Sequence, residues 1–348
     1  MVRIPDLGSR NSLTVMTHLV QICRGDRRAI AVCDEPHLRV IGGFLSIFDL
    51  AQKALAARTT VVDLVRTSVV VETLDYDAIY TGRSEWRLLT PIDHPREPAR
   101  CLVSGTGLTH LGSAANRQQM HEAAESDLTD SMKMFRSGVA GGKPAPGEVG
   151  VPPEWFYKGN GTILRAHGEP LDVPAFAEDG GEEAEIAGVY VIGEGGVPHR
   201  LGMVIGNEFS DHVFERQNYL NLAGSKLRTC AIGPELILDA PFNSVAGTVT
   251  ITRGGATLWS KTIVTGEQEM SHNLRNIEHH HFKFDAHRCP GDVHVHYFGA
   301  CALSFGDGVR LADGDVMEVA FTGFGRPLRN HVRITAGKGS PVVVRALG

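Results

Sequence analysis

Residues 183–192 read Glu-Ala-Glu-Ile-Ala-Gly-Val-Tyr-Val-Ile, so two acidic residues open an apolar run that is rich in β-branched side chains. Such a run predicts a β-strand. In a strand, residues i and i+2 point to the same face, so Glu183 and Glu185 project together. Two like charges on one face repel each other unless a cation or a proton relieves them. The stretch therefore predicts a strand whose first residues form an acidic site.

A third acidic residue follows further along the chain, in Gly206-Asn207-Glu208, on a second expected strand. Together with the first two it makes a cluster of oxygen donors, which suits Mg²⁺, Mn²⁺ or Ca²⁺ better than Zn²⁺. The alternative is a solvated edge of an acidic segment, because Glu178, Asp179 and Glu182 lie nearby. The residues alone leave both readings open.

The composition is that of an ordinary soluble protein. At 348 residues the chain is long enough for about two domains, and its net charge of −6 gives no sign of a nucleic-acid or membrane partner. No apolar run approaches the roughly 20 residues that a membrane-spanning helix needs, and we see no signal-peptide core. The six cysteines form no CxxC pair, so we expect free thiols in a reducing cytoplasm.

Two regions differ in their pattern. Residues 1–98 combine strand-like runs, such as 29–33, with a helical apolar pattern over 46–56, which predicts a small N-terminal α/β domain ending in a proline-rich linker. Residues 99–348 are mostly strand, turn and strand, with one or two helices. We therefore expect an α+β protein whose second domain is a β-rich mixed sheet that carries the acidic site.

Several short segments, taken in chain order, resemble the motifs of the fumarylacetoacetate hydrolase superfamily. Each is weak alone, but the ordered set is specific. The segments are Gly107-Leu108 with Ala114, Trp155 to Lys158, Glu183 to Gly193, Asn207 to Ser210, Ser225-Lys226 with Ile232 to Pro234, Pro290 to Asp292, and Gly323 to Asn330. The resemblance implies a β-rich roll of the superfamily's C-terminal type, a smaller N-terminal domain and a homodimer. It also implies Mg²⁺ (or Mn²⁺) held by Glu183, Glu185 and Glu208.

The chain departs from the superfamily's hydrolases at the position of the histidine that activates water, which is Ser113 here. The third metal ligand is a glutamate in place of the family's aspartate. The family's threonine segment near the end becomes His296-Tyr297-Phe298. The missing histidine argues against hydrolysis of a C–C bond.

Four stretches resemble one branch of the superfamily, the 2-keto-3-deoxy-pentonate dehydratases that act on L-arabinonate-derived sugar acids. They are Phe135 to Gly138, Gly206 to His212, Glu278 to Phe282 and Gly325 to Asn330. The resemblance implies dehydration of 2-keto-3-deoxy-L-arabinonate to 2-oxoglutarate semialdehyde. A metal-stabilised enolate would form when a C3 proton leaves, and the C4 hydroxyl would then depart as water.

Three residues are candidates for catalysis. Lys226 is expected to contact the enolate or to move its proton, and the alternative is a structural ion pair with Glu183 or Glu185. His212 and Glu215 follow the third ligand and are expected to protonate the departing hydroxyl. The alternative for these two is that they are exposed polar residues at the start of a helix.

Four residues are candidates for binding a 2-oxo sugar acid. Lys158 resembles the family's pocket lysine, with a surface lysine as the alternative, and His110 and Ser113 are expected to line the pocket. His296 either contacts the substrate or is a satisfied core histidine. Three consecutive side chains on a helix point about 100° apart, so the run 279–281 does not converge on one ion.

The leading hypothesis from the sequence is thus a Mg²⁺-dependent hydro-lyase. The first alternative is an acylpyruvate or diketo-acid hydrolase that uses a base from elsewhere, such as His212. The second is a protein that binds sugar acids without turnover.

Overall fold

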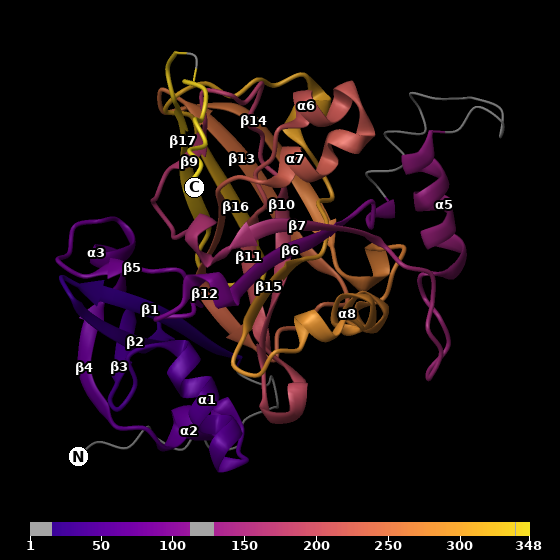
Figure 1. Ribbon diagram of the computed structural model, residues 1–348. Coiled ribbons are helices and arrows are strands. Elements are labelled where there is room, and N and C mark those ends of the chain that lie inside the picture. The colour runs from indigo at the N-terminus through magenta and orange to yellow at the C-terminus, as the bar shows by residue number, and fades with distance from the viewer. Residues whose placement is uncertain (1–15, 112–128, 338) are drawn as a thin grey trace.

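The computed structural model describes residues 16–111, 129–337 and 339–348, in which two β-sheets pack face to face (Figure 1). The outer face of the short sheet is partly exposed. The apolar side chains between the sheets form one core, with Ile186 and Ile205 contributed by the long sheet and Val249 and Val319 by the short one. The α+β class expected from the sequence is confirmed.

The long sheet contains the strands that matter for the site. In spatial order it runs β4 (Val70–Asp75), β3 (His37–Ile41), β2 (Arg27–Asp34), β1 (Thr17–Arg24), β12 (Cys230–Leu238), β11 (Pro198–Asn207), β10 (Ala184–Ile192), β15 (Val293–Tyr297), β6 (Cys101–Gly107) and β7 (Glu154–Asn160), with β5 (Arg87–Leu88) on β1 and β8 (Leu164–Arg165) on β12. The short sheet runs β14 (Ala256–Thr265), β13 (Val245–Arg253), β16 (Val316–Phe321), β17 (Leu328–Ile334) and β9 (Leu171–Val173).

The described helices are short. They are α1 (Ile47–Ala57), α2 (Val61–Thr67), α3 (Tyr76–Tyr80), α5 (Asp130–Gly141), α6 (His212–Gln217), α7 (Leu222–Lys226) and α8 (Leu274–Phe282). In α1, the helix expected over 46–56, the Ser46 side chain accepts the Asp49 N–H at 3.0 Å, and Arg58 ends the helix in the left-handed conformation. No helix of the described residues is long and apolar enough to cross a membrane.

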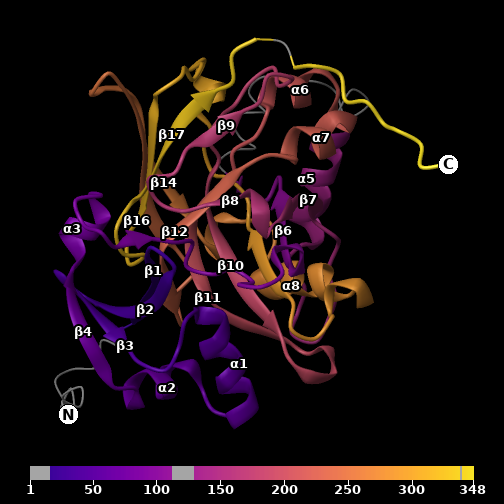
Figure 2. The same ribbon diagram turned by 60° about the vertical axis from the view of Figure 1, so that its left-hand side comes forward.

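The N-terminal unit is joined to the rest by backbone hydrogen bonds. Strand β1 pairs antiparallel with β12, with Leu19 opposite Leu236, so the long sheet continues from one unit into the other. In both views the N-terminal unit, drawn in indigo, lies at one end of the molecule, away from α6 and α7 (Figures 1 and 2). The boundary near residue 98 stays a prediction, because the sheet itself shows no break there.

The long sheet is strongly curved around the start of β10. Strand β7 lies four places from β11 in the strand order, yet Lys158 Nζ on β7 contacts Glu208 Oε1, just beyond the end of β11, at 2.5 Å. All nine residues of β10 are buried, as expected for a strand covered on both faces. The inner face of this curve is where the acidic residues meet.

Candidate metal centre

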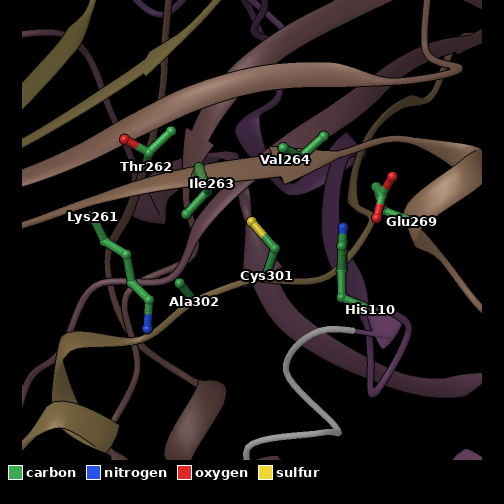
Figure 3. Close-up of a pocket in the computed structure, with 8 residues that line it drawn as sticks. All are labelled: His110, Lys261, Thr262, Ile263, Val264, Glu269, Cys301 and Ala302. Carbon is green, nitrogen blue, oxygen red and sulfur yellow. The ribbon is translucent and has the colours of Figure 1, made fainter.

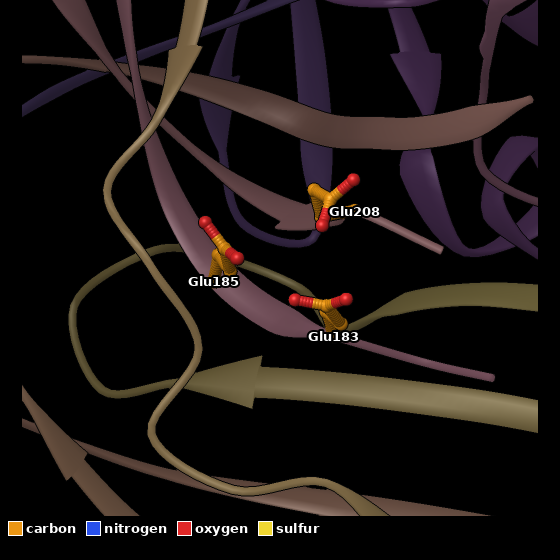
Figure 4. Close-up of side chains that lie close together, drawn as sticks. All are labelled: Glu183, Glu185 and Glu208. Carbon is orange, nitrogen blue, oxygen red and sulfur yellow. The ribbon is translucent and has the colours of Figure 1, made fainter. Parts of the chain in front are cut away.

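The three glutamates come together at adjacent ends of β10 and β11. The pairing of Ala184 with Asn207 places Glu183 beside Glu208, and the Glu208 N–H donates to the Glu183 carbonyl at 2.9 Å. Oxygen atoms of Glu183, Glu185 and Glu208 all lie within 4.8 Å of one another (Figure 4). The three side chains are buried, so the solvated acidic edge left open by the sequence is wrong.

The donor set fits a hard divalent cation. Burial, together with repulsion from Glu208 and Glu183, raises the pKa of Glu185 well above its usual value. Among the described residues Glu185 has no ion pair with lysine or arginine, and it accepts a hydrogen bond from Gly299 N at 2.7 Å. Lys158 and Lys226 already pair with Glu208 and Glu183, and a cation that prefers oxygen ligands would relieve the repulsion that remains at Glu185.

Lys226 is an ammonium held between two of the glutamates. Its Nζ lies 2.5 Å from Glu183 Oε1 and 2.6 Å from Glu208 Oε2, at the end of α7. Burial lowers its pKa, but the charges of Glu183 and Glu208 outweigh burial and raise the pKa well above the usual value. The Phe156 ring lies 4.8 Å from the same Nζ. The sequence left open that Lys226 forms an ion pair with Glu183 or Glu185, and the structure shows the pair with Glu183.

Lys158 is fully buried. Besides Glu208, its Nζ donates to the backbone carbonyls of Phe209 and Lys226, at 2.8 and 3.0 Å. The surface alternative for Lys158 is therefore wrong. Its contacts also tie β7 to the loop beyond β11, so this lysine holds the curve of the sheet closed around the triad.

His212 opens α6 and reaches the triad. Its Nε2 lies 3.0 Å from Glu183 Oε1, and it is buried. Burial lowers the pKa of His212, but the hydrogen bond and charge of Glu183 raise it above the usual value. Glu215, one turn further, is half-buried, and its charge acts on both His212 and Lys226. His212 is therefore not an exposed polar residue at the start of a helix, which was the alternative left open by the sequence.

One acidic residue near the site was not predicted from the sequence. Glu154, Phe156 and Lys158 alternate on β7, so the three share the face that looks onto the triad. The Glu154 carboxylate is buried, accepts from Tyr219, and occupies the space beside Gly107, where a Cβ would lie 1.9 Å from Glu154 Oε1. Glu154 and Lys158 are four residues apart and so share a face if the segment is a strand, and this spacing was the signal that would have found Glu154.

Of the two residues expected to line the pocket, His110 and Ser113, the structure describes one. Ser113 is outside the described residues. His110 Nε2 lies 2.7 Å from Thr265 Oγ1, and His110 lines a cavity of about 270 Å³ together with Cys301, Lys261 and Glu269 (Figure 3). This cavity borders the segment that follows Gly299, and among the described contacts His110 touches none of the three glutamates.

His296 faces away from the triad. Tyr297 pairs with Ala187 and so shares the face of Glu185, whereas His296 pairs with Gly188 and points to the opposite face. There its Nδ1 lies 2.8 Å from Ser104 Oγ, and its ring lies 4.4 Å from that of His281 on α8. The structure thus places His296 in a cluster of histidines under α8 and does not bring it to the acidic site.

The comparisons with known proteins bear on the fold. No protein-family model matches the chain, and no curated protein matches it. Solved structures do. The apo form of a 2-keto-3-deoxy-D-arabinonate dehydratase matches with a TM-score of 0.69 and 20% identity, over 92% of this chain and 100% of that chain. The same dehydratase complexed with magnesium and 2,5-dioxopentanoate matches with a TM-score of 0.68, the same identity and the same coverage.

An isomerase also has this fold. The 5-carboxymethyl-2-hydroxymuconate delta-isomerase from Mycobacterium smegmatis matches with a TM-score of 0.56 and 17% identity, over 91% of this chain and 100% of that chain. The chain therefore has the fold that these dehydratase and isomerase structures share, and this confirms the fold that the resemblance to the fumarylacetoacetate hydrolase superfamily implies.

Proposed function

We propose that this protein is a Mg²⁺-dependent dehydratase of a 2-keto-3-deoxy sugar acid and a member of the fumarylacetoacetate hydrolase superfamily. One observation carries the proposal: the buried triad of Glu183, Glu185 and Glu208, with Lys226 between two of its members. A dehydratase of the same fold has a structure with magnesium and 2,5-dioxopentanoate, which supports the same chemistry here.

The proposed substrate is 2-keto-3-deoxy-L-arabinonate, and the product is 2-oxoglutarate semialdehyde, which is 2,5-dioxopentanoate. The L configuration rests on the resemblance of the sequence to the L-arabinonate-derived branch, whereas the dehydratase structures of this fold are of a D-arabinonate enzyme. The elimination removes a C3 proton and the C4 hydroxyl, so one molecule of water leaves and none is consumed. The C3=C4 double bond formed in this way then shifts: a C5 proton is lost and a proton returns to C3. The C5 hydroxyl thereby becomes that of an enol, which tautomerises to the aldehyde of the product.

The cation would be held by the three glutamates. Bound Mg²⁺ or Mn²⁺ would supply a Lewis acid for the 2-oxo group of the substrate. The carboxylate oxygens suit both ions, because both prefer hard oxygen ligands.

Lys226 supplies a fixed positive charge at the site. Because the glutamates raise its pKa, Lys226 stays protonated and stabilises negative charge that develops on the substrate, instead of acting as a base. The Phe156 ring beside its Nζ keeps water away from one side of the ammonium.

The elimination step itself needs two proton transfers, one from C3 and one to the C4 hydroxyl. His212, bonded through Nε2 to Glu183, is proposed to donate a proton to the departing hydroxyl, with Glu215 supporting its charge. Glu154, on the site-facing side of β7, is proposed to take the C3 proton. The two groups would then divide the roles of acid and base, as elimination of water requires.

The remaining assignments are also proposals. His110 and Ser113 would border the substrate, and Lys158 would hold the pocket wall. The resemblance supports a homodimer in the cytoplasm that takes part in pentose catabolism. None of the contacts of His296 with the described residues supports a role as a substrate ligand.

The test is direct turnover. Incubation with each enantiomer of 2-keto-3-deoxyarabinonate and Mg²⁺, followed by ¹H NMR, should give 2,5-dioxopentanoate, faster from the L form. An acylpyruvate serves as the parallel substrate, and Glu185→Gln as the inactive control. Release of pyruvate from the acylpyruvate with no aldehyde from either sugar acid would establish the hydrolase alternative. Magnesium binding without any turnover would establish the non-catalytic one.

A further inference from the structure

The segment 299–307, here called the strap, runs from the end of β15 past the acidic site. We propose that Glu182 is a positioning residue that anchors the strap, so that the strap in turn holds Glu185 and His212 in place. The inference rests on the proposed function, because it concerns how the same site is kept ready for its cation.

The anchor is a pair of hydrogen bonds to one residue. Both Glu182 oxygens are used: Oε1 accepts from Ser304 N and Oε2 from Ser304 Oγ, each at 2.7 Å. Glu182 and Ser304 are both fully buried, and among the described residues Glu182 forms no ion pair with lysine or arginine. A buried carboxylate without a counter-charge is costly unless it is well hydrogen-bonded, so the geometry at Ser304 is tightly set.

The start of the strap contacts the expected metal ligand Glu185. Gly299 N donates to Glu185 Oε2 at 2.7 Å, which orients that carboxylate. Gly299 has a φ of +107°, and a Cβ there would lie 2.0 Å from Thr109 Oγ1. Thr109 in turn donates to the Phe298 carbonyl at 2.6 Å. Thr109 therefore holds the chain on the β15 side of Gly299, and on its other side Gly299 continues into the strap.

The part of the strap beyond Ser304 contacts His212. The Phe305 ring lies 5.0 Å from the ring of His212, whose Nε2 is bonded to Glu183. The guanidinium carbon of Arg310 also lies 4.2 Å from the centre of the Phe305 ring. Ser304 thus lies between two contacts that lead to two different metal ligands.

Glu182 is also the residue directly before Glu183. A displacement of the strap would therefore act on the chain at the ligand itself as well as through Gly299 and Phe305. Groups that orient metal ligands typically change metal affinity by about 10–100-fold when they are removed. We expect the lower end of that range, because Glu182 acts on the ligands through Ser304.

The experiment compares Glu182→Gln and Ser304→Ala with the wild-type protein. Glu182→Gln keeps the size of the side chain but provides only one acceptor, and Ser304→Ala removes only the hydroxyl bond. Glu235→Gln is the matched control, since Glu235 is an equally buried carboxylate that accepts from Tyr76 and from Arg326 N, remote from the strap. Amide exchange of peptides covering 299–307 and Mg²⁺ binding by calorimetry are the two readouts.

In Glu182→Gln we expect amide exchange in the strap to be about tenfold faster and the Mg²⁺ dissociation constant to be about tenfold higher. Ser304→Ala should change both in the same direction but less, and it serves as the test if Glu182→Gln does not fold. Glu235→Gln should change neither. Unchanged strap exchange, or faster exchange with unchanged Mg²⁺ affinity, overturns the inference.

The two proposals fail in different ways. A wild-type protein that neither binds Mg²⁺ nor dehydrates the sugar acid would overturn the proposed function. The exchange measurement would still decide whether Glu182 anchors the strap, because it needs neither metal nor substrate.

Discussion

Glu185 is the glutamate of the triad whose carboxylate is repelled by both of the others. It is buried beside two further carboxylates, and its pKa is raised by burial and by their charges. We expect Glu185→Gln to lose Mg²⁺ binding without loss of the fold. In the absence of metal the variant should be at least as stable as the wild type, because a neutral amide removes the repulsion.

The measurement is thermal unfolding with and without Mg²⁺. A ligand at 100 times its dissociation constant stabilises the folded state by about 2.7 kcal/mol, so the wild-type midpoint should rise and that of Glu185→Gln should not. Glu194→Gln is the control, because Glu194 is an exposed carboxylate just beyond β10. A Mg²⁺-dependent rise in Glu185→Gln would remove Glu185 from the ligand set.

Lys158 is expected to contribute to the stability of the fold. Replacing it by methionine would remove the buried ammonium that pairs with Glu208 Oε1 and would leave two buried backbone carbonyls without this donor. We expect Lys158→Met to lower the free energy of unfolding by about 3–5 kcal/mol, which urea titration measures. Lys133→Met, at an exposed lysine of α5, should have an effect near zero. A stable Lys158→Met with lost substrate affinity would instead favour a role in binding alone.

At the scale of elements, β15 and α8 enclose four histidines. His281 on α8 lies against His294 and His296 on β15, and His287 closes the cluster with Trp155. Trp155 Nε1 can only donate, so His281 Nδ1 accepts, and His281 Nε2 donates to His294 Nδ1 at 2.9 Å. Among the described residues His294 Nε2 and His296 Nε2 have no hydrogen-bond partner.

The cluster should make stability depend on pH. Burial, and repulsion from neighbouring histidines, lower the pKa of His294 and of His296 to about 3. Unfolded histidine has a pKa of about 6.5, so the unfolded state binds more protons as the pH falls below that value. The contribution of these residues is fully present above pH 6.5 and is lost progressively toward pH 3.

We therefore expect the free energy of unfolding to fall with decreasing pH more steeply in the wild type than in His294→Gln. The difference in slope should approach about 1.4 kcal/mol per pH unit between pH 6 and 4. Urea titrations across that range measure it. His199→Gln, at an exposed histidine, should keep the wild-type slope. Equal slopes for all three proteins would show that the cluster is not the source.

At the scale of the whole molecule, the N-terminal unit completes the long sheet. Strand β1 covers the edge of β12, and Leu19, Ile30 and Phe48 pack with Leu236 and Leu238 in one core. Removing that unit would expose a fully buried strand as an open edge, which is a site for aggregation.

We expect residues 99–348 expressed alone to be insoluble or aggregated, and co-expression with residues 1–98 to restore a soluble complex. Size-exclusion chromatography distinguishes the two. The full chain should unfold in urea in one transition, with the same midpoint by fluorescence and by circular dichroism. A monodisperse fragment 99–348 with its own cooperative transition would show that the sequence boundary near residue 98 separates two independent folding units.

The sequence predicted a large part of this fold and of its acidic site. The alternation of Glu183 and Glu185 before a β-branched run is a local property, and local periodicity determines which residues share a strand face. It also predicted α1 from its apolar spacing. The match of Glu208 to the same site depended on the order of motifs, because nothing local in its segment specifies a partner strand.

What the sequence by itself determined is thus the acidic start of the strand at Glu183 and Glu185, the α+β class and the candidate Glu208. The pair of glutamates follows from a pattern a few residues long, whereas Glu208 follows from the order of motifs along the chain. Only the tertiary structure decided that Lys226 is paired with Glu183, that Glu154 looks onto the site, that His296 faces away from it, and that Glu182 holds Ser304. These depend on curvature of the sheet, strand order and the path of a loop. They are set by packing between segments far apart in the chain, which no local pattern records.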